Sequence, residues 1–365
     1  MTPSIRMLAP AVQIFSNGDN EYRVRRGVWN FEEAVLNIED ASDEIKKAVS
    51  IIFEHLGGGQ EIDLQRLGEL VTLEQEELAQ VIDVLESLTA DGYLRADGST
   101  ANIVHQILGD AHRLDDSLIS ADQRPLLLYS DSEAVVDYAR DLVKGTPIEM
   151  DVLSLDEMNE IGSLDLTSRY DVYEDKSDQR RFSSRIEPYS CVVGCLERPR
   201  VSFLRNMNRM LISLSKSSVL SMVDGSFTFT MTLKPPETGC FECFETRLRA
   251  RIEDRTVYSQ YVDKVRAVSV APRSAGNTTL LHGLASAAMQ EGILLQKIGR
   301  SRLAGRVQST YLPLLEIQMQ DILRVPYCPA CGFGSSRSST AEMYASTSSM
   351  ADEFKRRVQL LGHDE

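Results

Sequence analysis

Two pairs of cysteines constrain this chain more than any other feature of its sequence. Cys240 and Cys243 lie in GCFECFETR, and Cys328 and Cys331 lie in YCPACGFG, so two residues separate the members of each pair. That spacing lets one tight turn aim both sulfurs at a single metal ion, and two such turns complete a tetrahedral set of four thiolates. The sequence therefore predicts one zinc site with these four cysteines as its ligands.

A zinc ion held by four thiolates indicates a structural site, because a closed shell of protein ligands leaves no position for a substrate. The two pairs lie much farther apart than in a zinc finger, so the metal would tie the C-terminal part of a domain to its middle. Two buried or redox-active cysteine pairs are the alternative. The remaining cysteines, Cys191 and Cys195, lie in the apolar run CVVGC, and we expect both to be small buried residues.

The composition is that of a globular protein with a large core. The 365 residues suggest two or three domains, and 42% of them are hydrophobic and 25% charged. No apolar run is long enough to span a bilayer, and the first residues lack the pattern of a signal peptide. We therefore expect a cytoplasmic protein with reduced thiols and no membrane partner.

The net charge of −15 is concentrated near the N-terminus, where residues 1–100 carry 8 Lys/Arg and 19 Asp/Glu, a net −11. Such a surface repels phosphate backbones, which argues against a nucleic-acid partner. A basic or apolar partner is favoured instead.

Residues 1–98 follow the element order of a winged-helix domain, with three strands and three helices. Residues 12–16, 22–27 and 28–38 are interpreted as the strands, and Asn17-Gly18 between the first two is a strong hairpin signal. Apolar residues at helical spacing then predict the helices, and ADGYLR follows as an extended wing. Trp29 opens the third strand, and we expect it in the core.

Residues 99–123 are interpreted as a linker, and residues 124–333 as an α/β domain. Short apolar runs in RPLLLYS, PIEMDVLSL and YSCVVGCL alternate with helical segments, which is typical of a parallel sheet covered on both faces. VLSMVDGSFTFTMTL adds an extended pair, and a buried helix is expected over 276–299. Residues 334–365 are predicted to form a flexible Ser-rich tail with a short final helix.

The middle of the chain resembles the ThiF-like, ubiquitin-activating-enzyme-like family. YSCVVGCLERPRVSFLRNMNRML is similar to that family's strand, acidic residue and helix with Arg and Asn. Glu197 lies near the acidic position, and Asn206 or Asn208 near the Asn position. The two cysteine pairs match the family's zinc pairs. The resemblance implies a Rossmann-type parallel sheet with a structural zinc site, and a homodimer as one expected assembly.

A closer resemblance is to the ThiF-like subgroup that accompanies YcaO-type cyclodehydratases in the biosynthesis of azole-containing ribosomal peptides (RiPPs), such as thiopeptides and bacteriocins. Those proteins join a PqqD-like winged helix, which recognises a leader peptide, to a ThiF-like body. The resemblance implies a subunit without catalytic residues that binds a precursor peptide and recruits it to the cyclodehydratase, which forms thiazolines or oxazolines.

In leader-recognition modules the leader adds as a strand to the edge of the small sheet, beside the third helix. The matching positions of this chain lie on its third strand and on the helix that follows residue 73. They are Phe31, Val35, Leu36, Ile38, Val81, Ile82 and Leu85. Each of them could equally be an ordinary core residue.

The chain departs from the adenylating members of the family at the turn after the first strand of the α/β domain. Glycines there let backbone N–H groups approach phosphate, whereas RPLLLYSDSEAVVDYA has Asp131 and Glu133. We expect these carboxylates to repel a triphosphate, so that no ATP binds to this chain. The alternatives are an ATP-dependent ThiF-like adenylating enzyme acting on a peptide carboxylate or amide, and a zinc-containing winged-helix regulator.

Overall fold

The structure is a computed structural model that describes residues 5–18, 20–96, 100–109, 124–167, 176–266, 268 and 278–332. Its contacts divide the chain into two compact units, Met1–Ile119 and Ser120–Glu365. Helix α4 (Thr100–Leu108) lies in the stretch expected to be a linker, and the expected Ser-rich tail lies outside the described residues. No helix in the described ranges has the length and apolar character needed to cross a membrane.

Unit 1 contains the three predicted strands as an antiparallel sheet. Strands β2 (Val12–Ser16), β3 (Glu21–Arg26) and β4 (Glu32–Asn37) are paired in the order β2-β3-β4. The third strand begins at Glu32 and not at Val28, because the residues before it form a tight loop. In that loop Gly27 has a φ of 82°, and a β-carbon on it would lie 2.6 Å from the carbonyl oxygen of Asn30.

Three helices share one core with this sheet: α1 (Asp43–Gly57), α2 (Leu67–Leu70) and α3 (Gln75–Ala90). Ser42 caps α1, since its hydroxyl accepts the third amide of the helix. A second small sheet has the order β5-β1-β6 and consists of β1 (Ile5–Leu8), β5 (Ile62–Asp63) and β6 (Leu94–Ala96). The sequence did not predict β1 and β5, because such short runs carry no periodicity.

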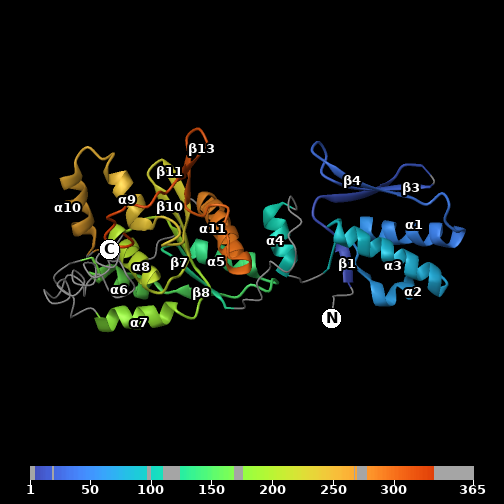
Figure 1. Ribbon diagram of the computed structural model, residues 1–365, viewed down its shortest axis with the longest axis horizontal. Coiled ribbons are helices and arrows are strands. Elements are labelled where there is room, and N and C mark those ends of the chain that lie inside the picture. Colours follow the sequence, from blue (N-terminus) through green and yellow to red (C-terminus); the bar gives the residue numbers. More distant parts are fainter. Residues whose placement is uncertain are drawn as a thin grey trace, which may run out of the picture. The chain divides into compact units, whose positions relative to one another are not determined.

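Unit 2 is built on one seven-stranded sheet with the order β13-β12-β11-β10-β9-β7-β8 (Figure 1). Four neighbouring strands are parallel: β7 (Leu126–Ser130), β8 (Met150–Leu153), β9 (Val192–Leu196) and β10 (Ser218–Asp224). Three antiparallel strands extend them: β11 (Phe227–Leu233), β12 (Arg306–Tyr311) and β13 (Glu316–Asp321). The expected α/β fold is confirmed, and the β12–β13 hairpin is an addition that the sequence did not predict.

Helices cover both faces of this sheet. The larger core lies under α6 (Leu155–Ser163), α7 (Lys176–Ile186), α8 (Val201–Ser213) and α9 (Phe241–Arg249). On the opposite face α5 (Glu133–Val143) and α11 (Thr278–Ile298) pack around Cys195. Helix α10 (Arg255–Arg266) contacts α8. The helix expected over 276–299 is therefore present as α11 and is buried along most of its length.

Candidate functional site

Four buried cysteines from two distant segments converge in unit 2. The sulfur of Cys240 lies 3.8 Å from that of Cys243 and 3.6 Å from that of Cys328, and the sulfurs of Cys243 and Cys331 are 3.4 Å apart. All four sulfurs lie within 4.8 Å of one another. A disulfide needs a sulfur–sulfur distance of about 2.05 Å, so these are four separate thiols.

The spacing of the sulfurs suits a tetrahedral metal ion. A zinc ion with Zn–S bonds of about 2.3 Å places its sulfur ligands about 3.8 Å apart. The distances in this cluster approach that value, and burial of all four thiols excludes water from the site. The four residues predicted from the sequence thus form a site that could hold a metal ion, and its soft sulfur donors fit zinc.

Two glycines allow the cysteine segments to approach each other. Gly239 comes directly before the first pair, and a β-carbon on it would lie 2.6 Å from the carbonyl oxygen of Ile322. Gly332 comes directly after the second pair, and a β-carbon on it would lie 2.6 Å from the carbonyl oxygen of Cys328. That same oxygen accepts the Gly332 amide at 2.9 Å, which closes the second turn. Any larger residue at either position would push the backbone segments apart.

Polar side chains of α8 hold α9, and with it the first cysteine pair, in position. Arg209 donates to the two carboxylate oxygens of Glu242 at 2.9 and 3.1 Å, and Arg205 donates to those of Glu245 at 2.8 and 2.5 Å. Asn208 accepts the first backbone N–H of α9 at 3.1 Å. These Arg and Asn side chains therefore bind a neighbouring helix, and both glutamates are buried.

The other residues that the resemblance singled out also have internal partners. Asn206 is buried and donates to the carbonyl oxygens of Ile161 and Leu164 at 2.8 and 2.7 Å, so it fixes the end of α6. Glu197 is half-buried, and its backbone N–H donates to the carboxylate of Asp131 at 2.8 Å.

The turn after β7 holds Asp131 inside the protein. Asp131 does not face solvent, because only 1% of its side-chain surface is exposed. Its two oxygens accept the backbone N–H groups of Glu197 and Arg198, each at 2.8 Å. Glu133 is exposed on α5. Asp131 therefore occupies this turn as a buried carboxylate.

The seven residues expected to bind a leader peptide differ in their burial. Phe31 and Val35 expose 48% and 54% of their surface. Leu36 and Ile82 are half-buried and pack against the core of unit 1. The remaining three are at most 5% exposed and are core residues in this conformation: Ile38, Val81 and Leu85.

The expectation that Trp29 lies in the core is wrong, since 94% of its surface is exposed. The tight loop at Gly27 carries it away from the sheet before β4 begins. Phe15 and Phe31 are also partly exposed, and the guanidinium of Arg25 lies 5.5 and 4.0 Å from their ring centres. Exposed aromatic residues on one sheet are a feature of binding surfaces, and hydrophobicity alone cannot separate them from core residues.

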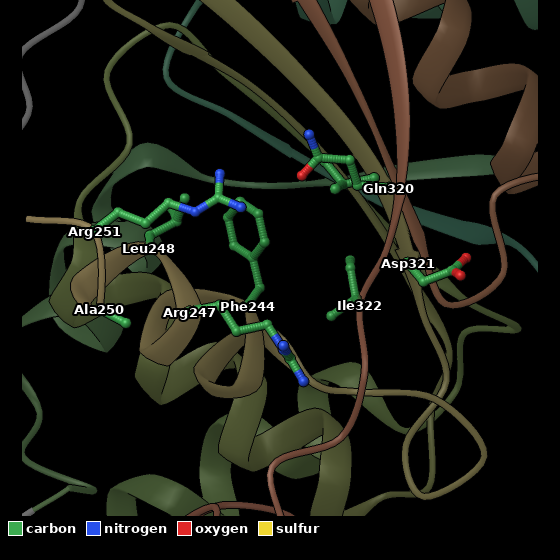
Figure 2. Close-up of a pocket in the computed structure, with 9 residues that line it drawn as sticks. Phe244, Arg247, Leu248, Ala250, Arg251, Gln320, Asp321 and Ile322 are labelled. Carbon is green, nitrogen blue, oxygen red and sulfur yellow. The ribbon is translucent and has the colours of Figure 1, made fainter.

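A pocket of about 310 Å³ lies between α9 and β13 (Figure 2). Its apolar lining includes Phe244, Leu248 and Ile322, and the exposed side chains of Arg247 and Arg251 also border it. Nothing in the sequence pointed to this pocket, because β13 was not predicted.

Cys191, directly before β9, and Cys195 on β9 are both buried, as expected. Burial raises the pKa of the Cys195 thiol, and the negative charge of Asp131 raises it further. A thiol in this state is a weak nucleophile, so the environment of Cys195 is that of a core residue.

No family model and no curated protein matches this sequence. Solved structures do share its fold. The heterocyclase TruD matches 91% of this chain with a TM-score of 0.55 and 16% identity, and a heterocyclase in complex with substrate and cofactor matches 90% with a TM-score of 0.55 and 15% identity. The likeness is one of fold.

The chain spans only 43% and 39% of the lengths of those two heterocyclases. A chain of the E. coli microcin synthetase McbBCD complex aligns with 89% of this chain and 99% of its own length, at a TM-score of 0.38 and 12% identity. That likeness is too distant to support a conclusion about fold or function.

Proposed function

We propose that this chain binds the leader of a ribosomal precursor peptide and presents the peptide to a YcaO-type cyclodehydratase. Unit 1 would be the PqqD-like winged helix that recognises the leader, and unit 2 a ThiF-like body held together by a structural zinc ion. The fold shared with two heterocyclases supports this proposal. The chain spans less than half of either protein, and we assign ring closure to a partner enzyme.

The observation that carries the proposal is the free edge of β4. Among the described residues, the order β2-β3-β4 leaves one side of β4 without a neighbouring strand. The Ile38 amide donates to the carbonyl oxygen of Asn20 at 2.8 Å, so even-numbered residues of this strand direct their N–H and C=O groups toward β3. Glu33, Val35 and Asn37 therefore direct theirs to the open side, where an extended peptide can add as a further strand.

The side chains beside this edge suit a peptide with apolar residues at alternate positions. Val35 is exposed on the outer face of the sheet opposite Arg23, and Phe31, just before β4, is also exposed. Leu36 points to the opposite face, where it is only partly covered by the core of unit 1. Glu33 forms an ion pair with Arg25 at 2.8 Å, so the charges of these two side chains beside the surface neutralise each other. Apolar contacts would therefore decide which leader binds, and backbone hydrogen bonds would hold it.

Ring closure requires activation of a peptide amide oxygen with ATP, and we assign that step to the partner enzyme. The carboxylate of Asp131 fills the turn that carries glycines in adenylating proteins, which supports this assignment. The buried ion pairs Arg205–Glu245 and Arg209–Glu242 support it further, because these guanidinium groups already have carboxylate partners.

The proposal is tested with Val35→Pro in the full chain. Proline has no backbone N–H, so this substitution removes one donor from the open edge of β4. The hydrogen bonds between β4 and β3 are not removed, because the Val35 N–H does not face β3. Ser16→Pro is the matched control, because the Asn17 amide bonds to Glu21 across the sheet and Ser16 therefore faces the opposite, outer edge of β2.

We expect Val35→Pro to weaken binding of the fluorescein-labelled leader of the co-encoded precursor by about tenfold or more, the effect of one strand hydrogen bond and its distorted neighbours. Ser16→Pro should bind like the unmodified chain, and circular dichroism should show both variants folded. Equal leader affinity for all three proteins would refute binding at β4.

A further inference from the structure

The carboxyl ends of β7 and β9 lie where the connections of the large sheet change direction. From β7 the chain passes to β8 on one side and then to β9 on the other side of β7, and the three strands are parallel. In open α/β sheets, ligands bind in the crevice outside the strand ends at such a point. Helices α5 and α8 begin shortly after these strands, so two helix N-termini with partial positive charge border the crevice.

The side chain of Asp131 occupies this crevice. It comes from the end of β7, and its oxygens accept the N–H groups of Glu197 and Arg198, the two residues that follow β9. The guanidinium of Arg198 also lies 3.9 Å from the carboxylate. The Asp131 carboxylate thus accepts two backbone N–H groups and lies beside an arginine. These are the surroundings in which proteins bind oxyanions.

Two buried hydroxyls near these strand ends have hydrogen-bonding capacity that Asp131 does not use. Arg200 is 7% exposed, and its guanidinium donates to the carbonyl oxygens of Val268 and Met158 at 3.1 and 3.2 Å. Burial lowers the pKa of this guanidinium, and the charge of Asp131 opposes that shift. Ser132 precedes α5 and Ser202 lies in the first turn of α8. Both are buried, and within the described ranges their hydroxyls have no hydrogen-bond partner. Buried hydroxyls of this kind are uncommon, and at a ligand site they are the groups that a ligand satisfies.

We infer that the crevice between β7 and β9 is an oxyanion-binding site whose resident anion is the protein's own carboxylate, Asp131. A small tetrahedral oxyanion such as phosphate is the ligand that the site accepts when this carboxylate is removed. While Asp131 is in place, a phosphate group meets a filled site and a like charge. The inference concerns unit 2 alone and does not depend on leader binding by unit 1.

The inference is tested by anion rescue of Asp131→Ala in the full chain. Removing the carboxylate leaves two buried N–H groups without their acceptor, so the variant should unfold at a lower temperature than the unmodified chain in chloride buffer. Added phosphate should raise its thermal midpoint in a saturable, concentration-dependent manner, because a ligand that binds only the folded state stabilises it. Calorimetric titration with inorganic phosphate should show one site per chain.

The unmodified chain and Asp137→Ala are measured in the same buffers. Asp137 lies on α5, and 72% of its side chain is exposed. Phosphate stabilises many proteins weakly by exclusion from their surface, so the decisive quantity is the extra stabilisation of Asp131→Ala over these two proteins. Equal stabilisation of all three would overturn the inference.

If Asp131→Ala does not fold in either buffer, Asp131→Ser is measured in the same way. Its hydroxyl can satisfy one of the two N–H groups while leaving room for an anion. Phosphate-dependent stabilisation of the Ser variant beyond that of the unmodified chain supports the inference, and its absence refutes it.

Discussion

The ring of Tyr129 on β7 lies directly over Gly194 on the neighbouring strand β9. A β-carbon on residue 194 would come within 2.1 Å of this ring. Both strands are buried along their whole length, so neither can move aside without disturbing the core. This contact explains a glycine in the middle of an otherwise apolar strand, where glycine is normally unfavourable.

Replacing Gly194 by alanine should therefore destabilise the protein. We expect Gly194→Ala to lower the free energy of unfolding by about 1–3 kcal/mol, the usual cost of overpacking a core. Urea unfolding followed by circular dichroism measures the change. Gly283→Ala is the control, since Gly283 is exposed on α11 and a β-carbon there meets nothing within 4 Å. That variant should be slightly more stable, and a Gly194→Ala variant of equal stability would contradict the packing.

The four-cysteine cluster should contain one zinc ion per chain. Elemental analysis of the purified protein should find about one zinc per chain, and Cys331→Ser should reduce the metal content to near zero and lower the thermal midpoint. Cys195→Ala is the matched control, because Cys195 is equally buried but lies on β9, outside the cluster. Full stability of the Cys331→Ser variant, or of the protein without metal, would show that the site is not structural.

The ion pair between Arg209 and Glu242 should contribute strongly to stability when only one partner is removed. Arg209→Met leaves Glu242, whose side chain is 6% exposed, as a buried charge without its partner, and we expect a loss of about 3 kcal/mol. The double variant Arg209→Met/Glu242→Leu should recover part of that loss. In contrast, Arg140→Met breaks an exposed pair with Asp137 and should cost less than about 0.5 kcal/mol. Similar losses for the two single variants would contradict this expectation.

The carboxyl of Asp151 should stabilise the protein at neutral pH but not at acid pH. A hydrogen bond from the Tyr189 hydroxyl, with further help from Arg185, holds the pKa of Asp151 below its ordinary value of 3.8. A carboxyl with a lowered pKa in the folded state stabilises that state above the unfolded pKa and loses this effect as the pH falls through the folded pKa. The stability difference between the unmodified chain and Asp151→Asn should thus shrink below about pH 4. Urea midpoints at several pH values measure it, and a constant difference would disprove it.

The sequence predicted those parts of the fold that carry a strong local pattern. The apolar runs of β7 and β9, the hairpin of β10 and β11, and the buried helix α11 appear within a few residues of their expected bounds. The four cysteines could be grouped from spacing alone, since two matched turns of this kind seldom occur in one chain by chance. Strands β12 and β13 were not predicted, because β13 is exposed along its whole length and has no buried face to set a pattern.

The role of Asp131 could not be derived from its neighbours in the sequence. Its partners are the backbone amides that follow β9, the first of them 66 positions later in the sequence. The burial of Asp131 therefore depends on the pairing of β7 with β9 in the sheet. Its place in the turn predicted only that a carboxylate there would repel a triphosphate, whereas the tertiary structure makes this carboxylate the acceptor of two backbone N–H groups. Trp29 was expected in the core because tryptophan is typical of cores. A loop whose shape depends on Gly27 places it at the surface instead.

The wide separation of the two cysteine pairs has a consequence during synthesis on the ribosome. Cys328 follows Cys240 by 88 residues, and helices α10 and α11 and the β12–β13 hairpin lie between them. We therefore expect the proposed zinc site to be completed only after all of these elements have been translated, with the first pair kept reduced until then. With zinc bound there, we expect the yield of folded protein to depend on zinc supply and on control of thiol oxidation late in translation.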